Sequence, residues 1–261
     1  MTNCNPMPTP LPQTLEKLDV TPFSEPTYLR SLAGKLQYLT ITRPDLQFTV
    51  NFICQRMHAP TNSEFTLLKR ILRYVKGTLN LGMPIRKHNN PTLSAFCYSD
   101  YAGCKDTRRS TSGFCILLGS TLVSWSAKRQ KTLSNSSTES EYRALSVVAR
   151  ELTWISSLLR DIGIPQYQPT RVFCDNLSAV YLSANPALHN WTKHFDKDFH
   201  YIRERVGLGL IETHHIPALL QLADIFTKPL PRPSFFDLRG KLGVSPPPVT
   251  SPPTFEGECR R

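Results

Sequence analysis

The chain lacks the features that would place it in a membrane or on a secretory route. None of its 261 residues belong to an apolar run near the length of about 18 that a bilayer span requires. The first residues, MTNCNPMPTPLPQ, contain neither a charged region nor an apolar region, so we expect no signal peptide. These absences favour an intracellular protein that does not contact membranes, and they leave its compartment open.

Paired cysteines are missing as well. The seven cysteines are scattered along the chain, odd in number, and never spaced as CxxC. Extracellular domains stabilised by disulfides and structural zinc sites both need regular cysteine or histidine spacings. The pattern therefore predicts reduced thiols in the core, without disulfides and without zinc.

Positive charge is what the chain has in excess. Its 31 Lys and Arg residues outnumber its 20 Asp and Glu residues, which gives a formal net charge of +11. A basic surface favours a polyanionic partner, most often nucleic acid. Charge alone leaves this partner a hypothesis.

Composition and periodicity divide the chain into four segments. Residues 1–27 contain six prolines and no apolar period, which indicates an extended lead-in. Residues 28–90 have the spacing of three amphipathic helices. Strand and helix patterns follow over residues 91–230. Residues 231–261 form a C-terminal extension whose proline-rich end we expect to be disordered.

Periodicity also predicts the individual elements. Helices are expected at 28–40, 44–60, 64–76, 139–161, 177–184, 193–206 and from about 221; strands are expected at 93–99, 113–118, 121–126, 170–175 and 208–216. Early hairpins followed by later crossovers predict an α/β fold with a mixed five-stranded sheet flanked by helices. A small helical segment precedes that sheet.

The helix at 64–76 has a second, basic face. Its members are Lys69, Arg70, Arg73 and Lys76. Such a face is either an ordinary solvated helix surface or a surface that follows a phosphate backbone. The sequence leaves both possibilities open.

Four acidic residues lie at the ends of predicted elements, namely Asp100, Glu141, Asp175 and Asp224. Asp100 and Asp175 each end a strand, where the ligands of open α/β sheets collect. Glu141 shares a helix face with the apolar residues that must pack on the sheet, whereas Glu139 aligns with Arg143 and is expected to face solvent. The pattern favours one shared site in which these carboxylates converge.

Each acid also has a simpler explanation. Asp100 could be a solvated charge in a surface turn, and Thr138 and Glu141 have the spacing of a capping box. Asp224 could be an acid favoured by the dipole in the first turn of a helix. Four such acids in a basic protein nevertheless favour a common site, because neighbouring carboxylates repel unless cations neutralise them. Oxygen ligands alone suit Mg²⁺ or Mn²⁺.

Seven longer stretches follow one another in a fixed order over nearly the whole chain. They are YLRSLAGKLQYLTITRPDLQFTVN, LLKRILRYVKGT, RRSTSGF, SSTESEYRAL, CDNLSAV, TKHFDKDFHYIRERV and QLADIFTKPL. In this order they resemble the C-terminal part of the Pol polyprotein of copia-type long-terminal-repeat retrotransposons. The resemblance implies the end of a reverse transcriptase in residues 28–90 and its ribonuclease H-like domain in residues 91–230.

The resemblance also implies a reaction and a set of site residues. A ribonuclease H of this family hydrolyses the RNA strand of an RNA–DNA hybrid with two metal ions, Mg²⁺ or Mn²⁺, held by a D-E-D-D set. Matched residue by residue, the set falls on Asp100, Glu141, Asp175 and Asp224, with Glu139 as the fallback for the second position. Two such ions would activate a water and stabilise the leaving 3′ oxygen.

Basic residues and hydroxyls near these acids are predicted to contact the phosphates of the hybrid. They are Lys105, Arg108, Arg109, Ser110, Lys128, Arg129 and Lys131, with Lys69 and Arg73 of the 64–76 helix as further candidates. The hybrid is therefore the expected partner. The remainder of a reverse transcriptase is a second possible partner, because the paired-aspartate motif of the polymerase is absent from the chain.

One motif departs from the family pattern. Copia-type elements usually have S-D-A-D-W-A-G where this chain has SDYAG, so two residues are missing directly after Asp100. We expect the shorter turn to displace the first metal ligand. A catalytically inactive transposon remnant that at most binds nucleic acid is the alternative hypothesis, and a fragment that acts through protein contacts is a third.

Overall fold

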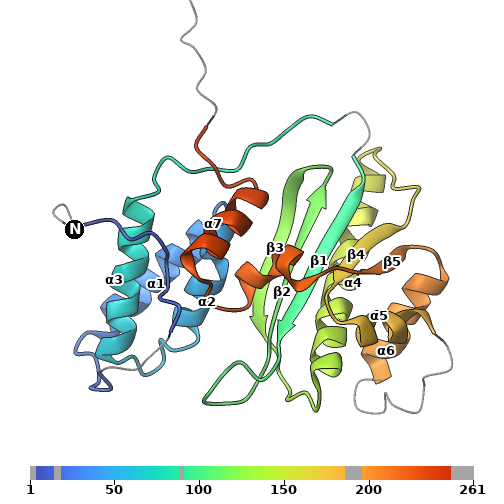
Figure 1. Cartoon of the computed structure of the whole chain (residues 1–261). Coiled ribbons are helices and arrows are strands. Elements are labelled where there is room, and N and C mark those ends of the chain that lie inside the picture. The colour runs from blue at the N-terminus through green and yellow to red at the C-terminus, as the bar shows by residue number, and fades with distance from the viewer. Residues whose placement is uncertain (1–3, 15–18, 89–90, 186–195, 248–261) are drawn as a thin grey trace, which may run out of the picture.

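The structure is a computed structural model that describes residues 4–14, 19–88, 91–185 and 196–247. It has one five-stranded sheet with helices packed on both faces (Figure 1). The predicted mixed five-stranded sheet flanked by helices is thereby confirmed. The expected helix start at 193 and the tail from 248 lie outside the described residues. No helix in the described ranges is long and apolar enough to cross a membrane.

The predicted elements up to residue 216 are present, with most ends shifted by a few residues. The helix expected at 44–60 begins as a 3₁₀ turn and ends at Cys54. The strands are β1 Leu93–Asp100, β2 Thr111–Leu118, β3 Thr121–Arg129, β4 Thr170–Cys174 and β5 Ile211–His215. The helices are α1 Pro26–Leu39, η1 Pro44–Leu46, α2 Gln47–Cys54, α3 Asn62–Lys76, α4 Ser137–Asp161, α5 Leu177–Ala184, α6 Asp196–Gly207, η3 Ala218–Leu220, η4 Leu222–Phe226 and α7 Arg232–Lys241.

The sheet has the strand order β3-β2-β1-β4-β5. The first three strands are antiparallel neighbours, whereas β4 runs parallel to β1 and β5 runs parallel to β4. Parallel neighbours end at the same edge of a sheet. Asp100, the last residue of β1, and Asp175, the first residue after β4, therefore lie at one edge, as the sequence predicts.

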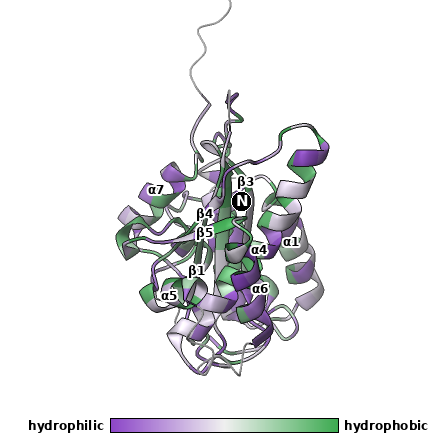
Figure 2. Ribbon diagram, turned by 90° about the vertical axis from the view of Figure 1, so that its right-hand side faces the viewer, coloured by the Kyte–Doolittle hydropathy of each residue, from purple (hydrophilic) through white to green (hydrophobic). Residues whose placement is uncertain are grey.

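Each face of the sheet packs against its own layer of helices. On one face, Leu145, Val148 and Leu152 of α4 are buried against β1, β2 and β4. On the other face, α1, α2, α3 and α7 share a core with residues of β2 and β3, such as Cys115 and Ala127. In Figure 2 hydrophobic residues gather along the strands, and the surface helices carry many hydrophilic ones. The helical segment and the sheet thus have a common core.

The helix predicted from about residue 221 is wrong in type and length. The chain forms the short 3₁₀ helix η4 there, and α7 begins only after Pro231. Pro229 and Pro231 lack a backbone N–H, so a helix cannot continue through them. Phe235 and Leu238 then bury α7 in the helical layer, which brings the C-terminal extension into the core.

The basic face of α3 holds the N-terminal segment of the chain. The contacts are Arg70 Nε to Thr9 O (3.2 Å), Arg73 Nε to Asn5 O (2.6 Å) and Lys76 Nζ to Cys4 O (3.0 Å). This use of the face was not predicted from the sequence. Nε of Arg73 is therefore engaged by protein backbone, and its role as a phosphate contact stays a prediction. Lys69 is exposed, with Nζ 4.9 Å from the ring centroid of Phe65.

Candidate metal centre

Glu141 extends from the start of α4 to the end of β1. Its Oε1 accepts a hydrogen bond from the backbone N–H of Ser99 (2.9 Å), and its Oε2 accepts one from Sγ of Cys174 (3.8 Å). Burial, together with the charges of Cys174 and Asp175, raises the pKa of Glu141 to about 10, although the hydrogen bond from Ser99 opposes the rise. Such a carboxyl group keeps its proton at neutral pH and would ionise beside a bound cation.

Glu139, and not Glu141, takes part in the N-terminal cap of α4, so the carboxyl group of Glu141 is not used in capping. Oγ of Ser136 accepts a hydrogen bond from the backbone N–H of Glu139 (3.1 Å), and Oε1 of Glu139 pairs with Arg143 (2.5 Å). The predicted capping pair of Thr138 and Glu141 is therefore wrong. Glu139 is also buried rather than solvent-facing, because this ion pair and cap hold it against the helix. Glu139 is thus occupied and is a poor fallback for the second ligand.

Gln130 ties the start of α4 to the ends of two strands. Its Nε2 donates to Oγ of Ser99 (3.2 Å), to Oγ of Ser112 (2.9 Å) and to the carbonyl oxygen of Ser140 (2.9 Å). These bonds set the position of the residue directly before Glu141. Sequence analysis missed Gln130, since a lone glutamine after a strand carries no pattern.

Asp175 follows β4 directly and stands beside Glu141. One ligand atom each from Glu141, Cys174 and Asp175 lie within 4.8 Å of one another, and this is the one such group of three in the described part of the chain. Burial raises the pKa of Asp175, the charge of Asp224 raises it further, and Lys228 opposes them. The two carboxylates offer the oxygen ligands that Mg²⁺ and Mn²⁺ prefer, whereas a thiol is too soft for these ions. The residues present therefore fit a divalent cation.

The 3₁₀ helix η4 carries Asp224 across the sheet (Figure 1). Gln221 anchors it, because its Nε2 donates to the carbonyl oxygen of Cys97 in β1 (2.9 Å). Gly113 in β2 makes room for it, since a Cβ at that position would come within 2.6 Å of Cγ2 of Thr227. The glycine of the RRSTSGF stretch thus allows Asp224 to approach the end of β1.

Lys228 enters the centre beside Asp224, and sequence analysis missed it. Its Nζ lies 2.9 Å from Oδ1 of Asp224 and 4.4 Å from the ring centroid of Tyr98. Burial by itself would lower the pKa of Lys228, but the hydrogen bond and charge of Asp224 outweigh burial and raise it. The spacing of four residues between Asp224 and Lys228 in QLADIFTK is the sequence signal that could have indicated the pair.

Asp100 is the last residue of β1, and its carboxylate lies against Gly103 in the loop that follows the strand. A Cβ at Gly103 would overlap its carboxylate, and Ala102 has a φ of 53°, a left-handed conformation that costs about 1–2 kcal/mol in an L-residue. Burial raises the pKa of Asp100, and Asp224 is the one described carboxylate whose charge raises it further. Asp100, like Asp224, lies outside the close group of Glu141, Cys174 and Asp175. Its displacement by the shortened turn stays a prediction.

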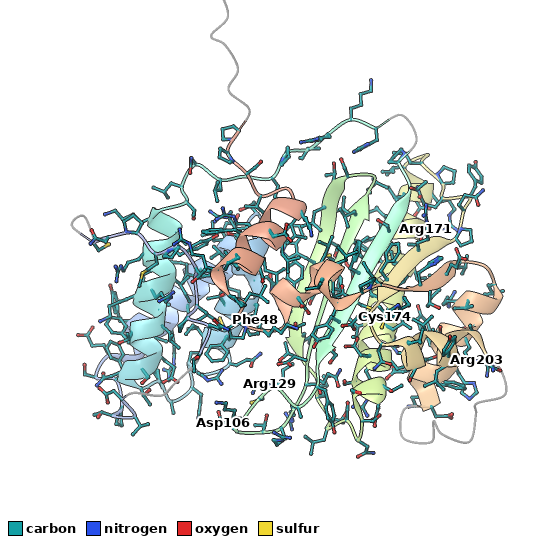
Figure 3. The ribbon with its side chains drawn as sticks, viewed as in Figure 1. Phe48, Asp106, Arg129, Arg171, Cys174 and Arg203 are labelled. Atoms are coloured by element: carbon teal, nitrogen blue, oxygen red, sulfur yellow. The ribbon has the colours of Figure 1, made fainter. Side chains whose placement is uncertain are left out.

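A cavity of about 630 Å³ separates the helical layer from the end of β1. Its charged lining comprises Arg56, Glu64, Asp100, Lys105, Asp106 and Arg129. Figure 3 labels Phe48, Asp106 and Arg129 around this cavity. Burial, and then the charge of Arg129, lower the pKa of Arg56, so the two guanidinium groups are close enough to repel. Asp100 therefore opens onto a space that also contains cations.

A second cavity, of about 670 Å³, lies between β3 and α4. Its charged lining comprises Lys128, Arg129, Lys131, Arg143, Arg150, Asp196, Lys197 and Asp198. The structure thus brings together three predicted phosphate contacts, Lys128, Arg129 and Lys131, and Arg129 lines both cavities. Because Arg143 was expected to face solvent from α4, the sequence did not indicate this basic cavity.

The connection from β1 to β2 holds the other predicted contacts. Lys105, Arg108 and Arg109 are exposed there. Ser110 is 1% exposed, and its Oγ accepts a hydrogen bond from the backbone N–H of Ala102 (3.1 Å). The hydroxyl of Ser110 therefore holds the turn after Asp100, and its contact with phosphate stays a prediction.

Comparisons with known proteins match nearly the whole chain, although no protein-family model matches it. It is 42% identical over 247 residues to the retrovirus-related Pol polyprotein from transposon RE1 of Arabidopsis thaliana. The match covers 94% of this chain and 17% of that relative. The corresponding polyprotein from transposon RE2 is 41% identical over 263 residues, and the match covers 100% of this chain and 18% of that relative. The chain spans less than a fifth of these relatives. Among solved structures, LC11-RNase H1 in complex with an RNA/DNA hybrid is 14% identical, with a TM-score of 0.39 over 52% of this chain and 94% of that one.

Proposed function

The chain belongs to the family of retrovirus-related Pol polyproteins from copia-type transposons, and on this premise we propose that residues 91–230 are a ribonuclease H-like domain that hydrolyses the RNA strand of RNA–DNA hybrids. Residues 28–90 would be the end of a reverse transcriptase. The observation that carries the proposal is the approach of Glu141 and Asp175 within 4.8 Å, at the edge where β1 and β4 end. Asp224 supports it, since its charge acts on both Asp100 and Asp175.

Glu141 and Asp175 would hold one Mg²⁺ or Mn²⁺ ion, and Asp100 and Asp224 would complete a site for two. Bound divalent ions supply an activated water and stabilise the leaving 3′ oxygen. The chain itself would orient the metal ligands and exclude water from them. The N–H of Ser99 orients Glu141, and burial of that side chain keeps water from competing for it.

The hybrid would be held through its phosphates. Lys128, Arg129 and Lys131 line the basic cavity beside α4, and the exposed Lys105 lines the cavity onto which Asp100 opens. Arg129 lines both cavities and could connect the two surfaces. Phosphate contacts carry no sequence information, which suits an enzyme that acts on hybrids of any sequence.

Cleavage of a labelled hybrid by the full chain tests this function. RNA should be cut with Mg²⁺ or Mn²⁺ and not with EDTA, and Asp175→Asn should abolish cutting. Because divalent ions bind only the folded site, Mn²⁺ should raise the melting temperature of the parent more than that of Asp175→Asn. Asp161→Asn, an exposed aspartate at the end of α4, is the matched control and should behave as the parent. Equal shifts in parent and Asp175→Asn would show that Asp175 is no ligand.

The inactive remnant is the second candidate function. The turn of Asp100 toward Gly103 and the left-handed Ala102 favour it, because both lie in the shortened turn that is expected to displace the first ligand. Under this alternative the parent binds hybrids in a salt-dependent way and cuts none at any metal concentration. Metal-dependent cutting by the parent excludes it.

A further inference from the structure

One side of the carboxylate group already has a cation supplied by the chain. Nζ of Lys228 lies 2.9 Å from Oδ1 of Asp224, with side-chain exposures of 33% and 16%. The same ammonium lies 4.4 Å from the ring centroid of Tyr98, within the range of a cation–π contact. Two independent contacts therefore hold the charge of Lys228 inside the centre rather than in solvent.

The charge of Lys228 acts on other acids besides its ion-pair partner Asp224. It acts on Asp100 and on Asp175, the two acids at the ends of β1 and β4. The other side of the centre has no such neighbour, because the described hydrogen-bond partners of Glu141 are the N–H of Ser99 and the thiol of Cys174. The centre is thus asymmetric, with a resident cation at Asp224 and none at Glu141.

We propose that Lys228 holds the second cation position of the centre, so that the protein takes up one divalent ion at Glu141 and Asp175 and a second only when Lys228 leaves Asp224. The inference rests on the proposed function and deepens it by setting the number and order of the ions. A divalent ion a few ångströms from an ammonium group is strongly repelled in a half-buried site. Lys228 is a positioning residue in this scheme, since it acts through Asp224.

Binding of Mn²⁺ to the full chain tests the inference, with calorimetry to give the number and affinity of the ions. The parent should bind one ion tightly and a second only weakly, because the second must displace Lys228 from Asp224. Lys228→Met keeps an unbranched apolar stem against Tyr98 but removes the charge, so it should bind two, the second at least about tenfold tighter than in the parent. Lys228→Arg keeps the charge and should behave as the parent. Lys241→Met is the matched control, because Lys241 pairs with Asp237 on α7 at 2.8 Å with the same spacing of four residues.

Melting temperatures separate this role from a purely structural one. Without metal, Lys228→Met should melt below the parent, because Asp224 has lost its counter-charge. Mn²⁺ should then raise its melting temperature more than that of the parent. A deficit that is the same with and without Mn²⁺, or one bound ion in both proteins, overturns the inference while leaving the proposed function intact. Failure of Mn²⁺ to bind to the parent overturns both. If Lys228→Met does not fold, Lys228→Gln, whose amide can still donate to Asp224, is measured against the same outcomes.

Discussion

The backbone N–H of Ser99 donates a hydrogen bond of 2.9 Å to Oε1 of Glu141. This bond joins the end of β1 to the start of α4 directly beside Asp100. The proposed ligands come from segments far apart in the sequence. Each therefore needs a contact of this kind with a neighbouring element to hold its side chain at the common edge of the sheet. Glu141 has this link and is buried by it, whereas Asp100 is held by its own turn.

Burial of Glu141 predicts that stability falls as pH rises. Burial and the charges of Cys174 and Asp175 raise the pKa of Glu141 from 4.5 to about 10. The folded protein therefore holds this proton more tightly than the unfolded chain. In EDTA the free energy of unfolding should decrease between about pH 4.5 and pH 10 because of this group. Glu141→Gln, which cannot ionise, should lack that part of the slope in urea unfolding across the range.

Divalent metal provides the control for the pH dependence. Mn²⁺ needs the ionised carboxyl group, so in its presence the slope should weaken or reverse in the parent. Glu141→Gln should show little response to the metal. The parent's slope persisting unchanged in Glu141→Gln would contradict the assignment of this pH dependence to Glu141.

Gly113→Ala should push η4 away from the sheet. The new Cβ would lie 2.6 Å from Cγ2 of Thr227 and 2.7 Å from Cβ of Phe226. Overpacking of this kind lowers the free energy of unfolding by about 1–3 kcal/mol. Hybrid cleavage should fall as well, because Asp224 moves with η4. Urea unfolding and the cleavage assay measure the two effects.

Gly34→Ala is the matched control for that substitution. Gly34 lies within α1, where an added Cβ meets nothing within 4 Å. Alanine should stabilise this helix by roughly 0.5–1 kcal/mol and leave cleavage unchanged. A Gly113→Ala protein as stable and active as the parent would show that η4 does not need this close approach.

The basic cavity predicts how hybrid binding depends on salt. If Lys128 and Lys131 each neutralise a phosphate, replacing both by alanine should reduce the slope of log K against log salt by about one unit per lysine. Fluorescence anisotropy in EDTA measures binding without cleavage. Arg160→Ala is the control: this exposed side chain pairs with Asp161 and lines neither cavity, so the slope should stay as in the parent. Identical slopes in all three proteins would show that the cavity is not part of the surface that binds the hybrid.

Restoring the missing residues after Asp100 should raise activity. Inserting Ala-Asp between Asp100 and Tyr101, with Tyr101→Trp, lengthens the turn that holds Ala102 in a left-handed conformation. Since a misplacement of about 1 Å can cost a hundredfold in rate, the cleavage rate should rise about tenfold or more. The same insertion between Gly119 and Ser120, in the β2–β3 turn, should give no gain. Brisk cleavage by the parent that the insertion does not improve would contradict the displacement of Asp100.

Much of the architecture could be predicted because its signals are local. Apolar periodicity indicated the strands and helices up to residue 216, and most of their ends differ by only a few residues. The error after residue 221 came from treating QLADIFTK as the start of a long helix, although Pro229 follows it at once. The cap of α4 was misassigned by two residues, because Ser136 and Thr138 offer equivalent hydroxyls and only the backbone geometry distinguishes them.

The sequence by itself determined which elements form and which carboxylates stand at their ends, since propensity and periodicity act over about ten to twenty residues. The tertiary structure alone decided how the charged groups are used. Arg73 binds the backbone of Asn5, which is 68 positions away. Lys228 reaches the ring of Tyr98 and enters the carboxylate group only because η4 folds back over β1. Such contacts depend on packing between distant segments, and no local pattern encodes them.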